Sequence, residues 1–289
     1  MANAITLAKT FIPILDKIYK QASLTSVLDG NPELVRQGAS YNEMIIPKIS
    51  MQGLADYSRN GGYVQGGVTM TNETVKCNFD RGRRFDVDVM DDLETAGLAF
   101  GRLSAQFIRD KVVPELDAFR FASYCGISGV TKKEETLADG AATVAALSAA
   151  VTAMDDEEVT ATGRYLFITP TLLQGINDMD TTKSKKVLEG FEQVIKVPQR
   201  RFYTAIKQLS GKTGEEAGGY TKAAGAANIN FAIVQKDALI QYTKHAAPKI
   251  IAPENNPDAD AYVFGYRMVG IAKAYKNMLS GMYFSHDKA

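Results

Sequence analysis

The spacing of apolar residues changes once, near residue 90, and this change constrains the fold more than any single motif. Before it, apolar residues occupy every second position, as they do in strands with one buried side. The alternating residues are Val75, Cys77, Phe79, Phe85, Val87 and Val89. A turn containing Gly82 is expected to separate the two runs. The sequence therefore predicts strands up to residue 90.

After residue 90 the spacing becomes helical and continues to Cys125. The residues expected on the buried face of the helix are Leu93, Phe100, Leu103, Phe107, Leu116 and Phe119. A helix of about thirty residues extends about 45 Å, which is far longer than an average globular helix. Pro114 is expected to bend it or to divide it in two, and Gly126 is expected to end it.

A glycine-rich stretch, DYSRNGGYVQGG at residues 56–67, precedes the alternating runs. It contains too much glycine for a helix and too many aromatic and charged groups for a plain linker. A strand-like run at residues 43–47 lies on its other side. Residues 44–90 are therefore predicted to be β structure, with the glycine-rich stretch at the far end of a hairpin.

The remaining parts have mixed signals. Apolar residues at helical spacing over residues 5–19 predict an amphipathic N-terminal arm. Within residues 137–250, helices are expected at 141–154, from Pro170 onward and at 236–244, with strands at 164–169, 229–235 and 249–252. Two long loops are expected there, at 179–189 and 211–228. The chain then ends in β-prone runs at 262–269, 271–275 and 282–284.

The composition argues against several classes of function. Lys plus Arg and Asp plus Glu both number 33 among 289 residues, so no net charge holds the chain on nucleic acid or an anionic membrane. The N-terminus lacks the pattern of a signal peptide, and no apolar run reaches membrane-spanning length. A cytosolic protein without a membrane partner is expected.

The residues that carry most enzyme chemistry are sparse. His245 and His286 are the only histidines, and neither lies in a zinc-binding or a nucleophile-and-base pattern. The Gly-Lys-Thr triplet at 211–213 resembles the end of a phosphate-binding loop, but Ile206 stands where the first glycine is required. We therefore expect no catalytic residue, no cofactor and no bound metal, and the protein is predicted not to be an enzyme.

Two charged clusters have both a functional and a structural interpretation. Asp86 and Asp88 share one strand side and suit a divalent cation, but the alternating apolar residues favour a solvated strand side. Arg81, Arg83 and Arg84 suit phosphate, but the flanking carboxylates favour ion pairs within the chain or with a neighbouring chain.

The order of the parts is more distinctive than any one of them. Two passages stand out: RFDVDVMDDLETAG at 84–97, with the helix end PELDAFRFA at 114–122, and NPDADAYVFGYR at 256–267. With the order of arm, glycine-tipped hairpin, long helix, α/β part and final strands, they resemble the major capsid proteins of tailed bacteriophages. The resemblance implies the α+β capsid fold of Hong Kong 97 type, which encapsulin shells share.

The resemblance also implies a division of the chain. The expected parts are an N-terminal arm (1–43), an extended loop formed by a β-hairpin (44–90), a peripheral domain with a long spine helix (91–136 and 251–289) and an axial α/β domain (137–250). The terminal strands are expected to return to the peripheral domain. The extended loop is expected to lie over an adjacent subunit.

The reach and the low stability of a hairpin also favour a position of the extended loop over an adjacent subunit. A hairpin tip ten residues from its base reaches about 33 Å, and an isolated two-stranded hairpin is marginal in water, so a neighbouring subunit is the natural cover. Glycine lets the tip bend to different curvatures. The residues expected to contact the neighbour are Asp56, Tyr57, Arg59, Gly61, Gly62, Tyr63, Arg81, Arg83 and Arg84.

The function that the resemblance implies is self-assembly, through pentamers and hexamers, into the icosahedral head shell that encloses a phage DNA genome. The amphipathic arm begins within the first few residues, so a separate scaffolding protein is the implied partner. A portal protein and weak, non-specific contact with packaged double-stranded DNA are also implied. The implied location is the virion, after assembly in the cytoplasm of the bacterial host.

Two alternatives remain open at this point. One is an encapsulin-like compartment shell that encloses protein cargo, because the fold is shared. The other is a cytosolic α/β enzyme or ligand-binding protein, in which the two long loops close over residues such as Asp178, Lys183 and Lys212.

Overall fold

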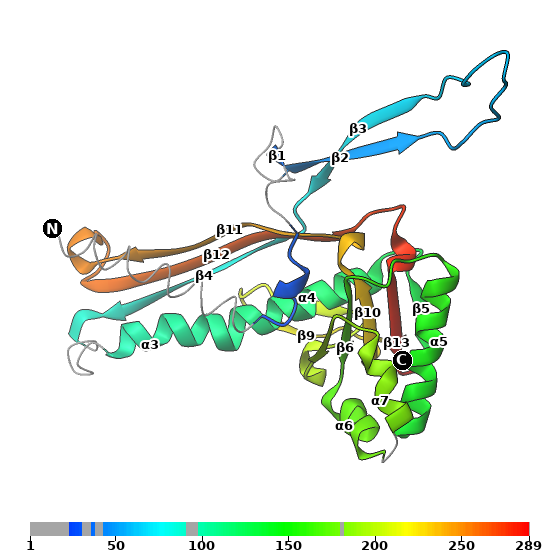
Figure 1. Ribbon diagram of the computed structural model, residues 1–289. Coiled ribbons are helices and arrows are strands. Elements are labelled where there is room, and N and C mark those ends of the chain that lie inside the picture. The colour runs from blue at the N-terminus through cyan, green and yellow to red at the C-terminus, as the bar shows by residue number, and fades with distance from the viewer. Residues whose placement is uncertain (1–22, 31–35, 38–42, 91–97, 180–181, 289) are drawn as a thin grey trace.

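The computed structural model describes residues 23–30, 36–37, 43–90, 98–179 and 182–288. Figure 1 shows three parts: a body of sheet and helices, a long flat region in which a helix lies along a sheet, and a hairpin that projects away from both. Most of the predicted N-terminal arm, and Leu93 of the predicted helix face, lie outside the described residues.

A five-stranded sheet forms the body, in the order β5-β13-β10-β6-β7. Its strands are β5 (Thr131–Glu134), β6 (Arg164–Ile168), β7 (Gln193–Lys196), β10 (Ile229–Gln235) and β13 (Met282–His286). Every residue of β6 and β10 is buried. Strands that are buried on both sides must be covered on both faces of their sheet.

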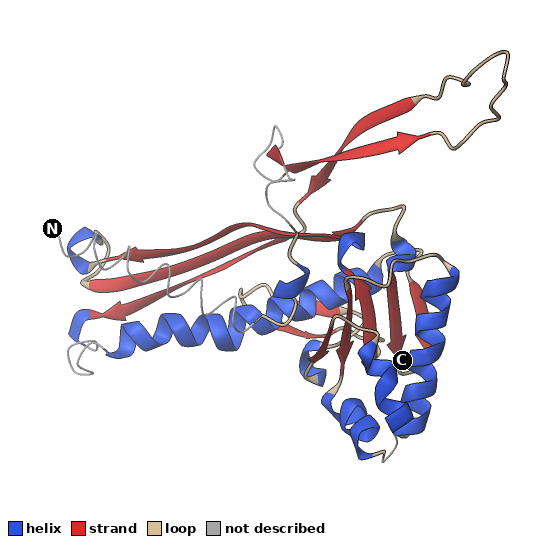
Figure 2. Ribbon diagram, in the orientation of Figure 1, coloured by secondary structure: helices blue, strands red, loops and turns tan. Residues whose placement is uncertain are grey.

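Helices supply that cover (Figure 2). On one face lie α5 (Gly140–Asp156), α6 (Pro170–Asp178) and α7 (Thr182–Glu189). Successive residues of β6 point to opposite sides: Leu166 packs in a cluster with α5 and α6, whereas Phe167 packs against Phe121 of α4 (Val113–Gly126). The body therefore has three layers, with the sheet in the middle.

A second, longer sheet contains β11 (Leu239–Ile251), β12 (Ala261–Ala274) and β4 (Phe79–Asp88), all antiparallel. The long helix lies along it (Figure 1). Phe107 of the helix meets Phe85 of β4 edge-to-face, with ring centroids 4.8 Å apart. The predicted amphipathic helix therefore buries its apolar face against this sheet.

The long helix has three segments: α3 (Leu98–Phe107), a π-helical segment η3 (Ile108–Val112) and α4. Pro114 lies in the first turn of α4, directly after η3. Because proline lacks a backbone N–H, it interrupts the regular hydrogen-bond ladder at this point. The backbone stays helical from α3 through η3 into α4, so Pro114 interrupts the α-helical ladder but does not divide the helix in two. The helix ends at Gly126, as predicted.

The predicted helix face agrees with the observed burial where it is described. Leu116 is buried and Phe107 and Phe119 are half-buried at the contact with the long sheet, and Leu103 is also half-buried. Phe100 lies in α3, but its side chain is outside the described residues. No helix in the described part of the chain combines the length and the apolar character needed to cross a membrane.

The projecting hairpin consists of β2 (Glu43–Met51) and β3 (Val68–Lys76), with the two-residue strand β1 (Arg36–Gln37) paired to β2. The glycine-rich stretch lies in the loop at the end far from the body (Figure 1). The prediction of a glycine-tipped hairpin is therefore confirmed.

The predicted turn at Gly82 is wrong. β4 runs through Gly82 without interruption and pairs with β12, not with β3. A Cβ at position 82 would lie 2.7 Å from the backbone oxygen of Tyr266, so the glycine permits a close approach of two strands. The predicted extended loop, 44–90, therefore joins strands of two different sheets.

Three other expectations are also wrong. The final strand, β13, lies inside the five-stranded sheet and does not return to the long sheet. After a 3₁₀ turn, η5 (Lys236–Ala238), the chain forms β11 and not a helix, since Ile240 and Tyr242 alternate into a buried cluster. The predicted loop at 179–189 contains α7, because Val187 and Leu188 pack on the body.

The predicted domain limits cut across these sheets. The range 137–250 takes in most of β11, which belongs to the long sheet, but omits β5 and β13, which belong to the body. The other predicted long loop, 211–228, contains β9 (Tyr220–Lys222), which pairs with β8 (Ile206–Gln208).

Candidate assembly surface

The hairpin carries most of the exposed large apolar side chains in the described part of the chain. Eight of the ten lie between residues 49 and 70. They are Ile49, Met51, Leu54, Tyr57, Tyr63, Val64, Val68 and Met70. Single exposed apolar residues are normal on a protein surface, but their concentration on one projecting element is typical of an interaction site.

The strand register places four of these residues on one face of the ribbon, which we call the apolar hairpin face. Its members are Ile49, Met51, Val68 and Met70. Ile49 pairs with Met70 and Met51 pairs with Val68, and directly paired residues point to the same side. The intervening pair, Ser50 and Thr69, is polar and points to the opposite side. The distal half of the hairpin is therefore amphipathic.

A tight turn forms part of the tip. The Gly62 N–H donates to the carbonyl oxygen of Ser58 at 2.7 Å, and the Ser58 N–H donates to that of Gly62 at 3.3 Å. Gly62 has a φ of 73°, a conformation that L side chains rarely adopt. At Gly61, by contrast, a Cβ would make an ordinary contact, 3.5 Å from Ser58 Oγ. Only Gly62 of this pair is therefore required by the backbone conformation.

Two aromatic rings flank this turn. The ring centroids of Tyr57 and Tyr63 are 5.0 Å apart and both side chains are exposed. Asp56 and Arg59 are exposed beside them. The structure therefore brings the six predicted contact residues at positions 56–63 together at one end of the hairpin.

The other three predicted contact residues, Arg81, Arg83 and Arg84, lie on β4 in the long sheet. Their assignment to the extended loop is therefore wrong. The reason is the misplaced turn at Gly82, which attached β4 to the hairpin. Arg84 forms an ion pair with Asp86 at 2.8 Å, and both side chains are about half exposed.

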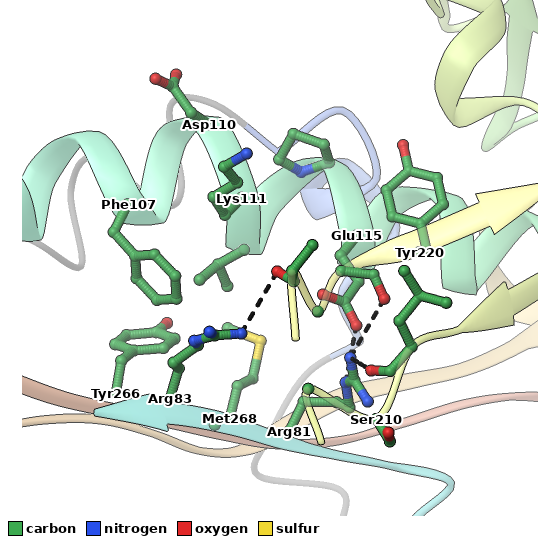
Figure 3. A pocket seen from close by; sticks show the side chains of 18 of the residues that line it. Arg81, Arg83, Phe107, Asp110, Lys111, Glu115, Ser210, Tyr220, Tyr266 and Met268 are labelled. Atoms are coloured by element: carbon green, nitrogen blue, oxygen red, sulfur yellow. Dashed lines mark hydrogen bonds and ion pairs between the residues drawn. The ribbon is translucent and has the colours of Figure 1, made fainter. Parts of the chain in front are cut away.

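Arg81 and Arg83 fasten the loop between β8 and β9 onto the long sheet (Figure 3). Arg81 donates to Glu115 Oε1 at 2.8 Å and to the carbonyl oxygen of Leu209 at 2.7 Å. Arg83 donates to the carbonyl oxygen of Glu216 at 2.9 Å. These contacts lie within one subunit, so both arginines join parts of the same chain.

A cavity of about 1120 Å³ lies between this loop, β4 and the long helix (Figure 3). Its lining mixes cationic, anionic and aromatic side chains, among them Lys111, Glu115 and Tyr220. Burial raises the pKa of Glu115, and this effect exceeds the lowering effect of Arg81. Burial also raises the pKa of Tyr220 to about 12.

The loop residues suggested for an enzyme do not converge on this cavity. Asp178 and Lys212 are not among its described lining residues, and the side chain of Lys183 is outside the described part of the chain. Asp86 and Asp88 are exposed on the solvated side of β4. Among the described residues, no three His, Cys, Asp or Glu side chains are grouped to hold a metal ion.

The sequence matches no protein-family model and no curated protein. Solved structures do match, however. The chain is similar to the capsid of Myoviridae phage XM1, with a TM-score of 0.55, 11% identity and 92% of each chain covered. It is also similar to the mature capsid of bacteriophage PhiM1, with a TM-score of 0.56, 9% identity and coverage of 85% of this chain and 82% of that one. The chain has a phage capsid fold.

The capsid fold is not confined to phages among the similar structures. A virus-like particle from Pyrococcus furiosus matches with a TM-score of 0.53 and 9% identity, over 93% of this chain and 98% of that one. The predicted α+β fold of Hong Kong 97 type is therefore confirmed.

Sequence reasoning missed the apolar face of the hairpin in this capsid fold. A signal was present, because Ile49 and Met51 alternate with polar residues before the glycine-rich loop, as Val68 and Met70 do after it. The signal was ambiguous because alternation shows that one side is apolar but does not show whether the chain covers that side itself.

Proposed function

We propose that the protein is the major coat subunit of a tailed-bacteriophage head, and that many copies assemble into an icosahedral shell around the DNA genome. The observation that carries the proposal is the apolar hairpin face, which is exposed on an element that projects from a capsid fold. A shell subunit needs a surface of this kind, which gains stability only when a neighbour covers it.

The energetics favour contact between subunits. A two-stranded ribbon is marginal in water on its own. Full burial of one aliphatic or methionine side chain contributes about 1.5–3 kcal/mol. Covering the four residues of the apolar hairpin face therefore supplies several kcal/mol toward the entropic cost of association. A closed shell repeats this contact in every subunit.

The partner that we propose is a second copy of the same chain. In a ring of subunits, each copy can offer its hairpin to one neighbour and receive the hairpin of another, so that rings close into pentamers and hexamers. The tip adds Tyr57, Arg59 and Tyr63, whose side chains are of the types that dominate binding energy at interfaces. Replacing Arg59 by glutamate is expected to impair shell closure.

The further partners that we propose are a separate scaffolding protein during assembly, a portal protein and packaged double-stranded DNA. The balance of 33 basic and 33 acidic residues supports only weak, non-specific contact with DNA. We propose a structural role without catalysis, in the virion, after assembly in the host cytoplasm.

Expression of the full chain, with and without a scaffolding protein, tests the proposal. Size-exclusion chromatography with light scattering and electron microscopy are expected to show closed particles of uniform diameter. A subunit that is folded by circular dichroism but stays monomeric under all assembly conditions would contradict the proposal.

A second candidate is an encapsulin-like compartment shell, which the similarity to the Pyrococcus furiosus particle favours. The two candidates differ in contents and in gene neighbours. Terminase and portal genes beside this one, with nuclease-protected DNA inside purified particles, would support the phage shell. A neighbouring peroxidase or ferritin-like gene, with protein cargo inside the particles, would support the compartment.

A further inference from the structure

Asp117, on α4, is a fully buried carboxylate to which the proposed function assigns no role. Its Oδ1 accepts hydrogen bonds from the Ser23 hydroxyl at 3.0 Å, the Thr25 hydroxyl at 2.7 Å and the Thr25 N–H at 3.2 Å. Its Oδ2 accepts from the Leu24 N–H at 3.1 Å and from Arg201 Nη1 at 3.2 Å. One carboxylate therefore holds three successive residues that are distant in the sequence.

Those residues begin the entry segment, our name for residues 23–30, through which the chain passes toward the hairpin. Arg120, one turn after Asp117 and also buried, holds the same segment. Its Nη1 donates to the Thr25 hydroxyl oxygen at 2.8 Å and its Nη2 donates to Asp29 Oδ1 at 3.1 Å. Since the Thr25 hydroxyl gives its one proton to Asp117, it accepts from Arg120 and links the two charges.

β11 contacts the entry segment from another direction. Gln241 Nε2 donates to the Thr25 carbonyl oxygen at 2.6 Å and to Asp29 Oδ1 at 2.8 Å. The Gly30 N–H donates to the Gln241 carbonyl oxygen at 2.9 Å. The end of the entry segment is therefore bonded directly to this strand.

The same stretch of β11 holds the base of the hairpin. Tyr242 packs in a buried cluster with Val75 of β3, and Lys244 Nζ donates to the carbonyl oxygen of Glu43, the first residue of β2. A Cβ at Gly30 would lie 2.7 Å from the Tyr242 ring, so the entry segment lies against the tyrosine that supports β3. Both hairpin strands and the entry segment therefore meet on residues 241–244.

We infer that Asp117 and Arg120 form a buried anchor that sets the direction in which the hairpin leaves the subunit. The anchor fixes the entry segment against α4 and β11, and the same stretch of β11 then fixes the ends of β2 and β3. Asp117 is a positioning residue, because it acts on the hairpin through these elements. Only the consequence for shell geometry rests on the proposed function.

The chemistry suits a fixed junction. A buried charge that loses one of its partners is costly, so the anchor tolerates one arrangement and disfavours others. Asp117→Asn keeps the shape of the side chain but replaces one acceptor oxygen by an NH₂ donor. The NH₂ group must point either toward the Ser23 and Thr25 hydroxyls or toward the Leu24 N–H and Arg201. In either orientation it faces groups that donate hydrogen bonds to Asp117 in the unaltered protein, so hydrogen bonds are lost.

Hydrogen–deuterium exchange on the purified full-length subunit tests the anchor without requiring assembly. In Asp117→Asn, we expect amide exchange to become about tenfold faster or more in the entry segment and in the basal parts of β2 and β3. Exchange in β6 and β10 is expected to stay unchanged. Unchanged exchange in the entry segment would overturn the anchor, and faster exchange there without any change at the hairpin base would overturn its control of the hairpin.

Two controls separate positioning from general stability. Asp110→Asn makes the same chemical change on the same long helix at an exposed position. It is expected to leave amide exchange unchanged in the entry segment and at the hairpin base. Ile233→Val removes one methylene group from fully buried β10, so it should lower overall stability without loosening the entry segment selectively. If Asp117→Asn fails to fold, Thr25→Val, which removes the hydroxyl between the two charges, replaces it with the same expected result.

Particle geometry provides the second readout. If the proposed shell forms, Asp117→Asn is expected to give particles of mixed diameter or open sheets, whereas Asp110→Asn and Ile233→Val give closed particles like those of the unaltered protein. Loosened exchange with particles of normal, uniform diameter would overturn the role in shell geometry. Failure of the unaltered protein to form particles would instead count against the proposed function and leave the exchange result to decide the anchor.

Discussion

The hairpin and the five-stranded sheet are both β structure rich in apolar residues. The same chain covers those residues in the sheet but leaves them exposed in the hairpin. In β6 and β10 every residue is buried by other parts of the same chain. In the hairpin, Met51 and Met70 are 71% and 65% exposed. Both regions have the same strand geometry, so the difference is whether other parts of the chain bury their apolar side chains.

This difference separates two kinds of stability. Residues of the body contribute to folding of the isolated subunit, because their contacts exist before assembly. Residues of the apolar hairpin face contribute only if another molecule covers them. Variants in the two regions should therefore have opposite effects on folding and on assembly.

The largest expected effect on the subunit is in the body. Phe167→Ala removes a fully buried ring between the sheet and α4 and is expected to lower the free energy of unfolding by about 3–5 kcal/mol. The measurement is urea unfolding followed by circular dichroism. Tyr63→Ala removes an aromatic ring from the hairpin tip, where it is 89% exposed, and should cost under about 0.5 kcal/mol. Equal losses in the two variants would show that the hairpin tip and the body contribute equally to the stability of the isolated subunit.

A smaller effect is expected at the contact between the β8–β9 loop and the long sheet. Arg81→Ala leaves Glu115, which is largely buried, without its ion-pair partner and is expected to cost about 1–3 kcal/mol. Adding Glu115→Gln should recover part of that loss. Arg84→Ala breaks an exposed pair on the same strand and should cost no more than about 0.5 kcal/mol.

The cost of Arg81→Ala should depend on pH. Burial raises the pKa of Glu115, and removing Arg81 takes away a charge that lowers it. The folded state then binds the proton more tightly than the unfolded state, so the destabilisation is present above the folded pKa. It should shrink as the pH falls through this raised folded-state pKa and should be absent below the unfolded-state pKa, where the carboxyl is protonated in both states. A loss independent of pH would show that the Arg81 contacts to carbonyl oxygens dominate.

A local effect is expected at the hairpin tip. Gly62→Ala forces a side chain into a conformation with φ of 73° and should cost about 1 kcal/mol at the turn. Gly61→Ala lacks that strain and serves as its matched control. The rate of tryptic cleavage after Arg59 should rise in Gly62→Ala alone, and shell closure should be impaired in that variant. Identical behaviour of the two variants would show that the turn does not need its glycine.

The smallest effect on the subunit, and the largest on assembly, is expected on the apolar hairpin face. Met51→Glu places a charge on this face and should change the free energy of unfolding by under about 0.5 kcal/mol, because the site is exposed. Particle formation should be lost, as measured by light scattering. Thr69→Glu places the same charge on the opposite face of the ribbon, so this variant should form more particles than Met51→Glu does. Normal shells from Met51→Glu would show that this face is not covered in the assembly.

Much of the fold could be predicted because local periodicity reports it directly. The long helix, the interruption of its hydrogen-bond ladder near Pro114 and the glycine-tipped hairpin follow from the spacing of apolar residues and from the positions of proline and glycine. The pairing of β4 could not be predicted in this way. A glycine between two alternating runs fits both a turn and a continuous strand. At Gly82 only the close approach of Tyr266 of β12 shows that the strand continues.

The functional residues also differ in whether nearby residues in the sequence reveal them. The tip residues at 56–63 were predicted, since glycine and aromatic residues in one short segment are a local signal. Asp117 gave no local signal, because its partners Ser23 and Thr25 are more than ninety residues away, at separations of 94 and 92. Only folding of the chain brings these residues together and buries Asp117.

The order of the elements, the hairpin tip and the long helix can be predicted from the sequence, since each depends on residues close together in the chain. Only the folded subunit shows which strands pair, which side chains β12 and α4 bury, and that the apolar hairpin face stays uncovered. Pairing and burial depend on contacts between distant residues, and the free energy of those contacts is not encoded in local spacing. The exposed face of the hairpin is therefore a property of the folded subunit.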